Sequence, residues 1–464
     1  MEIHSNVGKR VLTMNLRTAL RLQPQAVVSF VGGGGKTSLM FRLAAEIVAG
    51  GGRVVTTTTT RIFANQTSLA PQHIALTDPE QLPAAVIAKL AGHNHVLVTG
   101  PIDAAAGKAF GVSPQIVFEL ARTGVDAVLV EADGSRMRPL KAPAEHEPVI
   151  PDCTTNVVAV VGADVFGKPL TEDNVHRAER AAGLAEAGLG QPVTVEMAAA
   201  ILAHPLGGRK AVPASAHWTA FINKVETGAE MLPARALAER LLAVHGLPAL
   251  IGSALQNKPV CERVEPVAVV VLAAGASSRM AALGVPKPLL AWGKGSLLTR
   301  AVDAALRIGS APTQVVVGNL SGPVQRVLGT RKIQLVPNEH WQAGLSTSVV
   351  AALRAMDSAV GAAIFLQVDL PHVGTELLAA LIAQHRSTGA MIVAPRVDGR
   401  RANPMLFDRA LFPELLALRG DVGGRAVAEK YVAQTAWVDW SADILQDIDT
   451  PEDYAALRAA AEKN

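Results

Sequence analysis

Residues 269–290 read VVVLAAGASSRMAALGVPKPLL, and this stretch decides the fold of the second half of the chain. Its first letters are apolar throughout and predict a buried strand, which a loop of small residues at 274–278 then ends. Small side chains let backbone N–H groups approach a triphosphate, and Arg279 and Lys287 could neutralise its charge. A tight turn with two surface cations explains the same letters equally well, so the loop alone leaves both interpretations open.

A second glycine loop, VGGGGKTS, occupies residues 31–38, after the apolar run AVVSFVG and before a helical pattern. Lys36 and Thr37 stand where a P-loop places its phosphate lysine and its magnesium-binding hydroxyl, although the strict pattern would need a glycine at Phe30. We expect a flexible phosphate-binding nest at a helix N-terminus, and the alternative is a close-packed glycine turn. The expected phosphate-binding glycines are Gly32, Gly33, Gly34 and Gly35.

Polar residues follow other strands of the first half. The run AVLVEADGSR ends an apolar strand with Glu131 and Asp133, where a P-loop NTPase would place a magnesium carboxylate. Threonines at 56–60 could offer hydroxyls to Mg²⁺ or a phosphate, or could simply form a β-branched edge strand. The segment FINKVET is similar to the Asn-Lys-x-Asp loop that reads guanine, with Asn223 and Lys224 in place but Glu instead of the Asp. We therefore expect a nucleotide site in this half.

The composition is that of a packed globular protein, with 464 residues, of which 49% are apolar and 18% charged. The net charge of +3 and the absence of a basic run make a nucleic-acid partner unexpected. Cys153 and Cys261 lie too far apart for a zinc site or a disulfide framework. The N-terminus has no apolar signal core, and no run approaches the ~18 apolar residues that span a bilayer. We expect a cytoplasmic protein with no membrane association.

Strands and helices alternate along both halves. The apolar runs are AVVSFVG, GRVVTTTTT, HVLVTG, DAVLVEADG and NVVAVVG in the first half, and AVVVLAAG, TQVVVGN, KIQLVPNE, AAIFLQVDLP and GAMIVAP in the second. Strands that are apolar throughout, each followed by a helix, predict parallel sheets covered on both faces. We predict an α/β protein of two doubly wound domains, 1–256 and 266–464, joined by a proline-containing charged segment at 256–266.

Two acidic positions in the second half are candidate magnesium ligands. Asp369 ends the buried strand of AIFLQVDLPHV, and ligands of open α/β sheets bind at the carboxyl ends of strands. The segment DIDTPEDY places Asp447 and Asp449 before a helix that Pro451 begins. An acidic first helical turn explains this segment by itself. Together with Asp369, however, Asp449 becomes a candidate second carboxylate for Mg²⁺.

The second half resembles the molybdenum cofactor cytidylyltransferase family over residues 266–464. The motifs that carry the resemblance, in family order, are VLAAGASSRM, the downstream Lys287, NEHWQAGLSTSV, QVDLPHV, RRANPMLF, RGDVGGRA and DIDTPEDY. The resemblance implies a Rossmann-like nucleotidyltransferase domain. Such enzymes transfer CMP from CTP to the phosphate of molybdopterin that carries molybdenum, and they release pyrophosphate.

The resemblance also implies roles for particular residues. Arg279, Lys287 and Asp369 would be catalytic, and Asp369 and Asp449 would hold Mg²⁺. The phosphate loop would contain Leu272, Ala273, Ala274, Gly275, Ser277 and Ser278. The nucleotide or pterin side would be lined by Asn338, Gly344, Ser346 and Ser348. The acceptor side would contain Asn403, Pro404, Gly420, Asp421, Gly423 and Arg425.

The choice of base depends on one methyl group. In the wider family, L-A-G-G loops accompany GTP and L-A-A-G loops accompany CTP, and the loop here has Ala274 at the deciding position. Its methyl group would occupy space that a purine needs. The sequence departs from the family at Ala281, where glycine is usual, and at Lys287, which comes about three residues later than in the shortest family loops.

The first half resembles the accessory proteins of selenium-dependent molybdenum hydroxylases over residues 15–255. The matching segments are FVGGGGKTS, VVTTTTTRIF, VEADGSRMRPLKAPAEHEPVIP, VGADVFGKPL, VHRAER and FINKVE. The resemblance implies a place in the maturation of molybdenum hydroxylases, with a hydroxylase that receives the cofactor. The glycine loop and the acidic residues of this half predict a P-loop-NTPase-like domain that either binds or hydrolyses ATP or GTP. Two alternatives stay open, namely a nucleotidyltransferase for another phosphorylated acceptor and a non-catalytic molybdenum cofactor chaperone.

Overall fold

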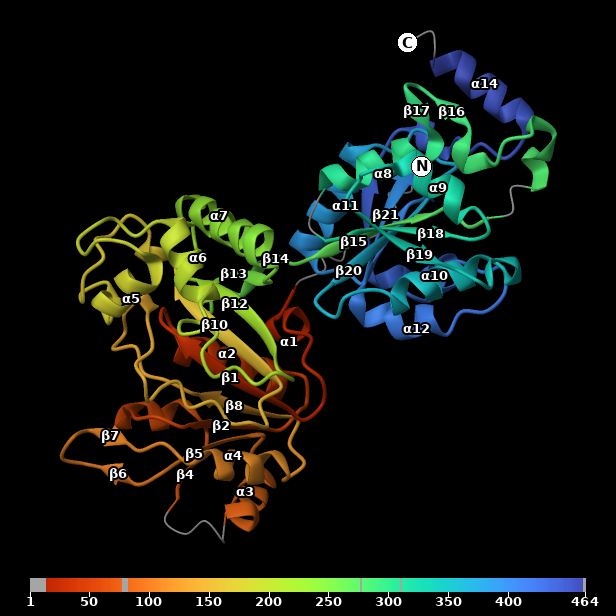
Figure 1. Cartoon of the computed structure of the whole chain (residues 1–464). Coiled ribbons are helices and arrows are strands. Elements are labelled where there is room, and N and C mark those ends of the chain that lie inside the picture. Colours follow the sequence, from red (N-terminus) through yellow and green to blue (C-terminus); the bar gives the residue numbers. More distant parts are fainter. Residues whose placement is uncertain (1–13, 77–81, 276–277, 309–310, 462–464) are drawn as a thin grey trace, which may run out of the picture. The chain divides into compact units, whose positions relative to one another are not determined.

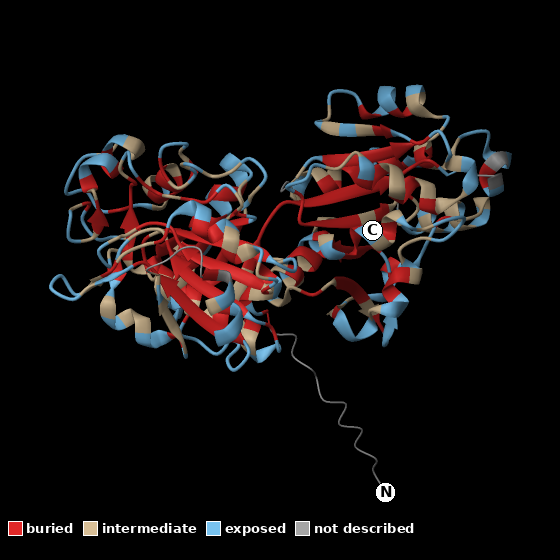
Figure 2. Ribbon diagram, turned by 90° about the horizontal axis from the view of Figure 1, so that it is seen from below, coloured by how far each residue is buried: buried red, intermediate tan, exposed pale blue. Residues whose placement is uncertain are grey.

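The computed structural model describes residues 14–76, 82–275, 278–308 and 311–461 (Figure 1). The chain folds into two compact units, Met14–Val264 and the described residues of Glu265–Asn464. In both units the strands are largely buried (Figure 2). Among the described residues, no helix has the length and apolar character needed to cross a bilayer.

The N-terminal unit is built on a nine-stranded sheet. In spatial order its strands are β14 (Val260–Val264), β13 (Ala249–Gly252), β12 (His217–Asn223), β10 (Asn156–Gly162), β1 (Ala26–Gly32), β8 (Ala127–Glu131), β2 (Val54–Thr58), β5 (His95–Thr99) and β4 (His73–Ala75). Every pairing is parallel except that of β13 with β14. The predicted parallel sheet is confirmed, with one antiparallel edge strand that we did not expect.

Helices cover this sheet on both faces. They are α1 (Leu16–Ala19), α2 (Lys36–Ala49), α3 (Leu82–Leu90), α4 (Pro114–Ala121), α5 (Ala178–Ala185), α6 (Val195–Ala203) and α7 (Gly228–His245). In β10, Val157 and Val161 pack into the cluster that contains residues of α5, α6 and α7. Val158 and Val160 instead pack with α2. Side chains of a strand point alternately to its two faces, so a strand covered on both sides must be apolar throughout.

The C-terminal unit has an eight-stranded mixed sheet. The order is β19 (Ile333–Pro337), β18 (Thr313–Val317), β15 (Val267–Leu272), β20 (Ala362–Gln367), β23 (Met405–Asp408), β21 (Ile392–Val397) and β22 (Arg400–Arg401), and β24 (Thr435–Asp439) also pairs with β21. Its helices are α8 (Leu297–Ile308), α9 (Ser321–Leu328), α10 (Leu345–Arg354), α11 (Thr375–Thr388), α12 (Phe412–Leu416), α13 (Arg425–Lys430) and α14 (Pro451–Ala461). Residues of α8 and α11 share one hydrophobic cluster, and residues of α12 lie in another. This is the expected doubly wound arrangement, except that β23 is antiparallel to both of its neighbours and the short strand β22 is antiparallel to β21.

Short elements complete both units. The short strands are β3 (Ile62–Phe63), β6 (Ile102–Asp103), β7 (Lys108–Ala109), β9 (Leu140–Lys141), β11 (Val175–His176), β16 (Ala291–Trp292) and β17 (Gly295–Ser296). The 3₁₀ helices are η1 (Ala64–Leu69), η3 (Ala163–Val165), η4 (Ser278–Leu283), η5 (Lys287–Leu289), η6 (Trp341–Ala343), η7 (Arg409–Leu411), η8 (Val432–Gln434) and η9 (Ala442–Leu445).

The segment predicted to join the two domains is not a free linker. Residues Val260–Val264 form β14, which pairs with β13 and completes the N-terminal sheet. Val260 and Val264 are buried although prolines and charges surround them in the sequence. Those prolines and charges conceal a five-residue strand, so the N-terminal unit extends to Val264. Cys153 and Cys261 are both free thiols.

Candidate functional site

A cavity of about 580 Å³ opens at the carboxyl ends of β15 and β20 in the C-terminal unit. Ligands of open α/β sheets bind at this edge, because loops rather than side-chain layers follow the strands there. The lining residues are Leu272, Ala273, Ala274, Gly275, Arg279, Met280, Lys287, Pro288, Trp341, Gln342, Ala343, Gly344, Leu345, Ser348, Gln367, Val368, Asp369, Asp421 and Asp449.

One lysine ties the two predicted metal carboxylates together. The Nζ atom of Lys287 lies 3.0 Å from Oδ2 of Asp369 and 2.9 Å from Oδ1 of Asp449. Arg279 donates from Nη1 to the other oxygen of Asp449 at 2.5 Å. The structure thus brings together all four residues that the motifs assign to catalysis or metal binding in this half.

Charge around Lys287 shifts the pKa of several groups. Burial opposes the charged ammonium, but the carboxylates of Asp369 and Asp449 outweigh burial and raise the pKa of Lys287. The hydrogen bond from Lys287 is the largest influence on Asp449 and lowers its pKa. Burial, followed by the negative charges of Asp449 and Asp369, raises the pKa of Asp447. The three groups therefore form one electrostatic unit.

The remaining oxygen of Asp369 is suited to a cation. Its Oδ1 atom is buried and has no hydrogen-bond partner among the described residues. A buried carboxylate oxygen without a partner is unfavourable, and a bound cation would satisfy it. The backbone N–H of Ile448 donates to the Asp369 carbonyl at 3.0 Å, which holds the DIDTPED segment beside this carboxylate. Carboxylate oxygens are ligands that Mg²⁺ prefers, so these residues fit a magnesium ion, with Asp369 as one ligand and Asp449 as a second.

The structure shows the acidic first helical turn of DIDTPED, whereas the role of Asp449 as a metal ligand stays a prediction. Asp453 accepts hydrogen bonds from the backbone N–H groups of Asp449 at 3.2 Å and Thr450 at 2.8 Å, as an acidic residue in a first helical turn does. This cap fixes the chain at the start of α14. It leaves the Asp449 side chain directed at Lys287 and Arg279, so helix capping and the carboxylate site are parts of the same local structure.

The glycine–alanine loop forms one wall of the cavity. Leu272, Ala273, Ala274 and Gly275 all line it, and Ala274 is only 4% exposed. The Ala273 N–H donates to the carbonyl of Val316 on the neighbouring strand β18 at 2.9 Å. Ser277 lies outside the described residues, and Ser278 is described only as the first residue of η4.

Two of the four residues predicted for the nucleotide or pterin side line the cavity, namely Gly344 and Ser348. Asn338 instead donates to the hydroxyls of Thr347 at 2.9 Å and Ser348 at 3.0 Å. Ser346 donates from its hydroxyl to the carbonyl of Gly420 at 2.7 Å. Asn338 and Ser346 therefore hold the wall in place, and neither is a lining residue.

On the predicted acceptor side, only Asp421 lines the cavity. It accepts from the backbone N–H of Leu345 at 3.2 Å, at the start of α10. Asn403 is exposed, Pro404 is buried, and neither is among the lining residues. Arg425 is exposed, pairs with Glu429 one turn along α13 at 3.1 Å, and is not a lining residue either. These three residues do not line this cavity, and their assignment to the acceptor side stays a prediction, because the motif letters do not show which way each loop faces.

Trp341, Gln342 and Gln367 line the cavity although we did not predict them. Trp341 lies within the NEHWQAGLSTSV motif, so that motif could have indicated it. A Cβ atom at Gly318 would lie 2.8 Å from the indole ring and 2.9 Å from the Ala274 carbonyl. The glycine therefore lets Trp341 pack beside the Ala274 loop.

In the N-terminal unit the glycine loop is packed, and the expectation of a flexible nest was wrong. A Cβ atom at Gly34, which has φ +76°, would lie 2.1 Å from the Gly162 nitrogen. The N–H groups of Gly33 and Gly34 donate to the carbonyls of Val160 and Arg138, both at 2.9 Å. Gly32 and Gly35 also have positive φ, and a Cβ atom at either would meet a neighbour within 2.6 Å. The close-packed alternative therefore describes the loop, and α2 follows with Gly35 as its N-cap, which makes no side-chain cap hydrogen bond.

Lys36 and Thr37 nevertheless meet the predicted acidic pair. Lys36 is 3% exposed, and its Nζ donates to the Gly32 carbonyl at 2.6 Å and lies 3.2 Å from Asp133. The Thr37 hydroxyl donates to Glu131 at 2.7 Å. Burial raises the pKa of Glu131, while Lys36 and Thr37 act in the opposite direction. Lysine, hydroxyl and carboxylates thus converge at the start of α2, as the motif predicts.

A further buried charge network adjoins this group. Lys141 lies 3.0 Å from Asp133 and 2.7 Å from Glu147, and Arg177 also pairs with Glu147. Burial is the largest influence on Lys141 and lowers its pKa. We did not predict this network, although Lys141 and Glu147 both lie in the RPLKAPAEHEPVIP segment.

The two residues of the guanine-like motif are already engaged within the unit. Asn223 donates from Nδ2 to the Gly34 carbonyl at 2.7 Å and accepts at Oδ1 from the Ala254 N–H at 3.0 Å. Lys224 donates to Asp164 at 3.0 Å. Asn223 therefore supports the glycine loop from behind, and its amide is not free to read a base.

Two known families match separate parts of the chain. The YqeC protein family matches residues 28–179, and the MobA-like NTP transferase domain matches residues 269–435. The first match lies within the N-terminal unit, and the second covers the strands and loops that form the cavity. These matches confirm the fusion that the sequence motifs predict.

Several individual proteins are similar to parts of the chain. The chain is 36% identical to YqeC of Escherichia coli (strain K12) over 208 residues, which cover 43% of this chain and 75% of that protein. It is 31% identical to the bifunctional protein GlmU of Syntrophotalea carbinolica over 128 residues, 28% of this chain and 27% of that protein. Among solved structures, the Rv0371c homologue from Mycobacterium sp. strain JC1 is 28% identical, with a TM-score of 0.39 and coverage of 42% of this chain and 97% of that one.

The identity to YqeC extends over three quarters of that relative, and the second family matches the unit whose cavity holds the cations and carboxylates. The chain therefore belongs to the YqeC family, and its C-terminal unit is a MobA-like nucleotidyltransferase domain.

Proposed function

We propose that the C-terminal unit transfers CMP from CTP to the phosphate of molybdopterin carrying molybdenum, forming the cytosine dinucleotide and pyrophosphate. The observation that carries this proposal is the contact of Lys287 with both Asp369 and Asp449 in a cavity bounded by the Ala274 loop. Cations and metal-binding carboxylates are what a triphosphate requires, and no protein nucleophile is needed.

The chain's own residues position the reacting groups. A phosphate oxygen of the acceptor forms a bond to the α-phosphorus of CTP, while the bond from that phosphorus to the β-phosphate oxygen breaks. Arg279 and Lys287 stabilise the charge that develops on the departing pyrophosphate. Gly344 and Ser348 also line the cavity, where Ser348 offers its hydroxyl to the substrates.

Asp369 and Asp449 would hold Mg²⁺, since Oδ1 of Asp369 is buried and has no hydrogen-bond partner among the described residues. When bound there, the ion supplies charge neutralisation for the triphosphate. Asp447 lies in the same electrostatic unit, and its pKa is raised first by burial and then by the negative charges of Asp449 and Asp369, which a cation would neutralise.

The proposal of cytosine rests on Ala274. Its side chain belongs to a hydrophobic cluster with Leu272 and Trp341, and it is almost fully buried. A methyl group held rigidly at this point narrows the space beside the nucleotide. A pyrimidine ring is smaller than a purine ring, so this wall favours CTP over GTP.

The proposed acceptor rests on the unit to which the nucleotidyltransferase domain is fused. The N-terminal unit belongs to the YqeC family, and the motifs of both halves resemble molybdenum hydroxylase maturation proteins. In this proposal the N-terminal unit binds ATP or GTP at Gly35, Lys36 and Thr37 and serves delivery of the cofactor to a molybdenum hydroxylase. Glu131 and Asp133 complete that site.

The test supplies the purified full chain with Mg²⁺, molybdopterin with molybdate, and each of the four NTPs separately. The expected product is the cytosine dinucleotide, identified by mass, together with pyrophosphate. Asp369→Asn should abolish its formation, whereas Asp152→Asn, a change at an exposed aspartate of the other unit, should not. Pyrophosphate released only with a sugar phosphate or another phosphorylated acceptor would refute the proposed acceptor. Binding of molybdopterin without any turnover would favour a cofactor chaperone.

A further inference from the structure

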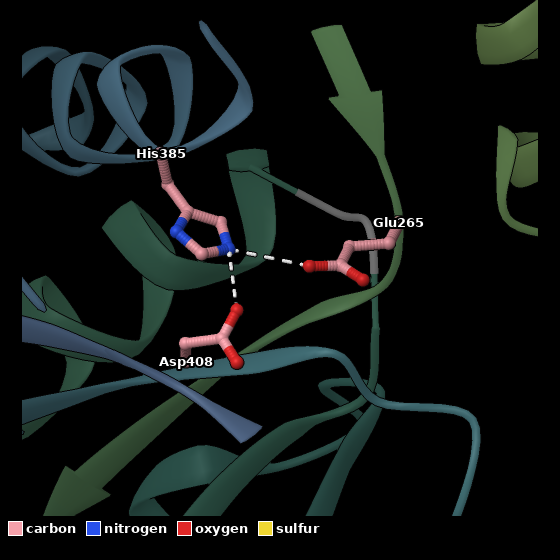
Figure 3. A group of neighbouring side chains, drawn as sticks. All are labelled: Glu265, His385 and Asp408. Atoms are coloured by element: carbon pink, nitrogen blue, oxygen red, sulfur yellow. Dashed lines mark hydrogen bonds and ion pairs between the residues drawn. The ribbon is translucent and has the colours of Figure 1, made fainter. Parts of the chain in front are cut away.

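A second group of potential metal ligands lies in the C-terminal unit, outside the nucleotide cavity. Glu265 precedes β15, His385 lies on α11, and Asp408 is the last residue of β23. All three side chains are buried, with His385 0% and the two acidic residues each 3% exposed. Figure 3 shows the imidazole directed at one carboxylate oxygen of each acidic residue.

The distances match those between ligands of one small cation. The Nε2 atom of His385 lies 3.2 Å from Oε1 of Glu265 and 3.7 Å from Oδ2 of Asp408. The ligand atoms of all three residues lie within 4.8 Å of one another. Zinc–ligand bonds of about 2.0–2.1 Å in a tetrahedron place neighbouring ligand atoms roughly 3.4 Å apart. The two measured separations lie on either side of that value.

Neighbouring groups fix the orientation of the ligands. The Ala390 carbonyl lies 3.1 Å from Nδ1 of His385, and a carbonyl can only accept, so Nδ1 carries a proton and Nε2 faces the carboxylates. Asp408 accepts the Ala410 N–H at Oδ1, at 2.8 Å, which leaves Oδ2 turned toward the histidine. Metal-binding histidines commonly donate their other ring N–H in this way.

Glu265 is held by close packing against the backbone. A Cβ atom at Gly361 would lie only 2.1 Å from Oε2 of Glu265, so the absence of a side chain there makes room for the carboxylate. A divalent cation on Nε2, Oε1 and Oδ2 would bind both carboxylates and the imidazole and would link the three elements.

We propose that Glu265, His385 and Asp408 bind one divalent transition-metal ion, of which Zn²⁺ is the best match to a nitrogen–oxygen ligand set. The ion has a structural role and is separate from the ion proposed for the nucleotide. Glu265 lies at the start of β15 and Leu272, which lines the cavity, at its end, so roughly 20 Å separate the two sites at ~3.3 Å per residue. A metal here holds the start of β15, strand β23 and helix α11 together.

The experiment measures bound metal in the full chain. Chain stripped with a chelator is loaded with Zn²⁺, passed over a desalting column and analysed for zinc. The proposal expects about one tightly held zinc ion per chain in the wild type and in Asp369→Asn, and a loss of that ion in His385→Gln. His217→Gln removes an exposed histidine of the other unit and should retain the ion. Circular dichroism checks that each variant is folded.

A measurement on the unaltered cluster removes any dependence on the folding of His385→Gln. Co²⁺ added to the stripped Asp369→Asn chain should give the visible absorption of a tetrahedral nitrogen–oxygen site, and added Zn²⁺ should abolish it. Zinc retained equally in wild type and folded His385→Gln would overturn the proposal. So would the absence of both tightly bound zinc and the cobalt spectrum, in which case a proton on Nε2 joins the histidine to Glu265.

Discussion

The ammonium of Lys287 lies 3.0 Å from Asp369, which is 82 residues away in the sequence, and 2.9 Å from Asp449. One cation thereby holds two carboxylates that come from different loops at the same edge of the sheet. This contact links the glycine–alanine loop, the end of β20 and the start of α14 into one site. It also determines how the site should respond to mutation and to pH.

Lys287→Gln should lower kcat of the nucleotidyl transfer by about a hundredfold or more, because a positioned charge on the leaving group is lost. The matched control is Lys294→Gln, which changes an exposed lysine of the same unit and should leave kcat unaltered. Steady-state rates of pyrophosphate release measure both. Equal rates for the two variants would mean that Lys287 only organises the carboxylates.

The stability contributed by Asp449 should depend on pH in a defined direction. Its folded pKa is lowered, so its contribution is complete above the unfolded value of about 3.9 and disappears as pH falls through the folded pKa. Urea unfolding of wild type and Asp449→Asn should therefore differ most near neutral pH and converge in acid. Lys287 has a raised pKa, so its contribution is present below about 10.4 and is lost as pH rises through the folded value. A difference between the two proteins that grows in acid would contradict this assignment.

Ala274→Gly should weaken the preference for CTP over GTP. Removing one methyl group from a close-packed wall changes discrimination by roughly tenfold or more. The comparison is the ratio of kcat/KM for the two nucleotides in wild type, Ala274→Gly and Ala273→Gly. The last variant removes a methyl group from the adjacent lining residue and should keep the wild-type ratio. An unchanged ratio in Ala274→Gly would show that the base is selected elsewhere.

Gly34→Ala should destabilise the N-terminal unit strongly. Gly34 has φ +76°, and its new Cβ atom would lie 2.1 Å from a backbone nitrogen, so the chain would have to shift. Gly51→Ala is the matched change, because Gly51 has φ +81° but open space around it. Calorimetry should show a loss of about 1 kcal/mol for Gly51→Ala, from the backbone conformation alone, and a clearly larger loss for Gly34→Ala. Equal losses of unfolding free energy in the two variants would mean that the glycine loop shifts to accept the new Cβ atom at little cost.

Lys36→Ala should abolish binding of a fluorescent ATP or GTP analogue to the N-terminal unit. The lysine lies at the start of α2, beside the hydroxyl of Thr37 and the carboxylates of Glu131 and Asp133, so a bound phosphate would meet it. Lys89→Ala, at an exposed position, serves as the control and should bind as the wild type does. Fluorescence anisotropy with Mg²⁺ present reports the affinity. Undiminished binding by Lys36→Ala would remove the loop from consideration as a nucleotide site.

Local pattern was enough to locate the main strands. AVVSFVG and NVVAVVG coincide with β1 and β10, since a strand buried on both faces must be apolar at every position. The alternation of such strands with helices was enough to predict two doubly wound units. The pattern of apolar residues did not predict β14, because charged residues and prolines surround that strand in the sequence. It also did not predict the antiparallel direction of β23.

For the site, the sequence by itself determined which residue types were available, namely two cations, two carboxylates and a loop of small residues. Only the tertiary structure decided which of them meet. Ser348 lines the cavity while Asn338 supports it from outside, and Arg425 faces Glu429 although its motif is intact. The meeting of Glu265 and His385 spans 120 residues. Motifs record local chemistry, whereas the direction of a side chain and its distant partners depend on how loops from separate strands pack at one edge of a sheet.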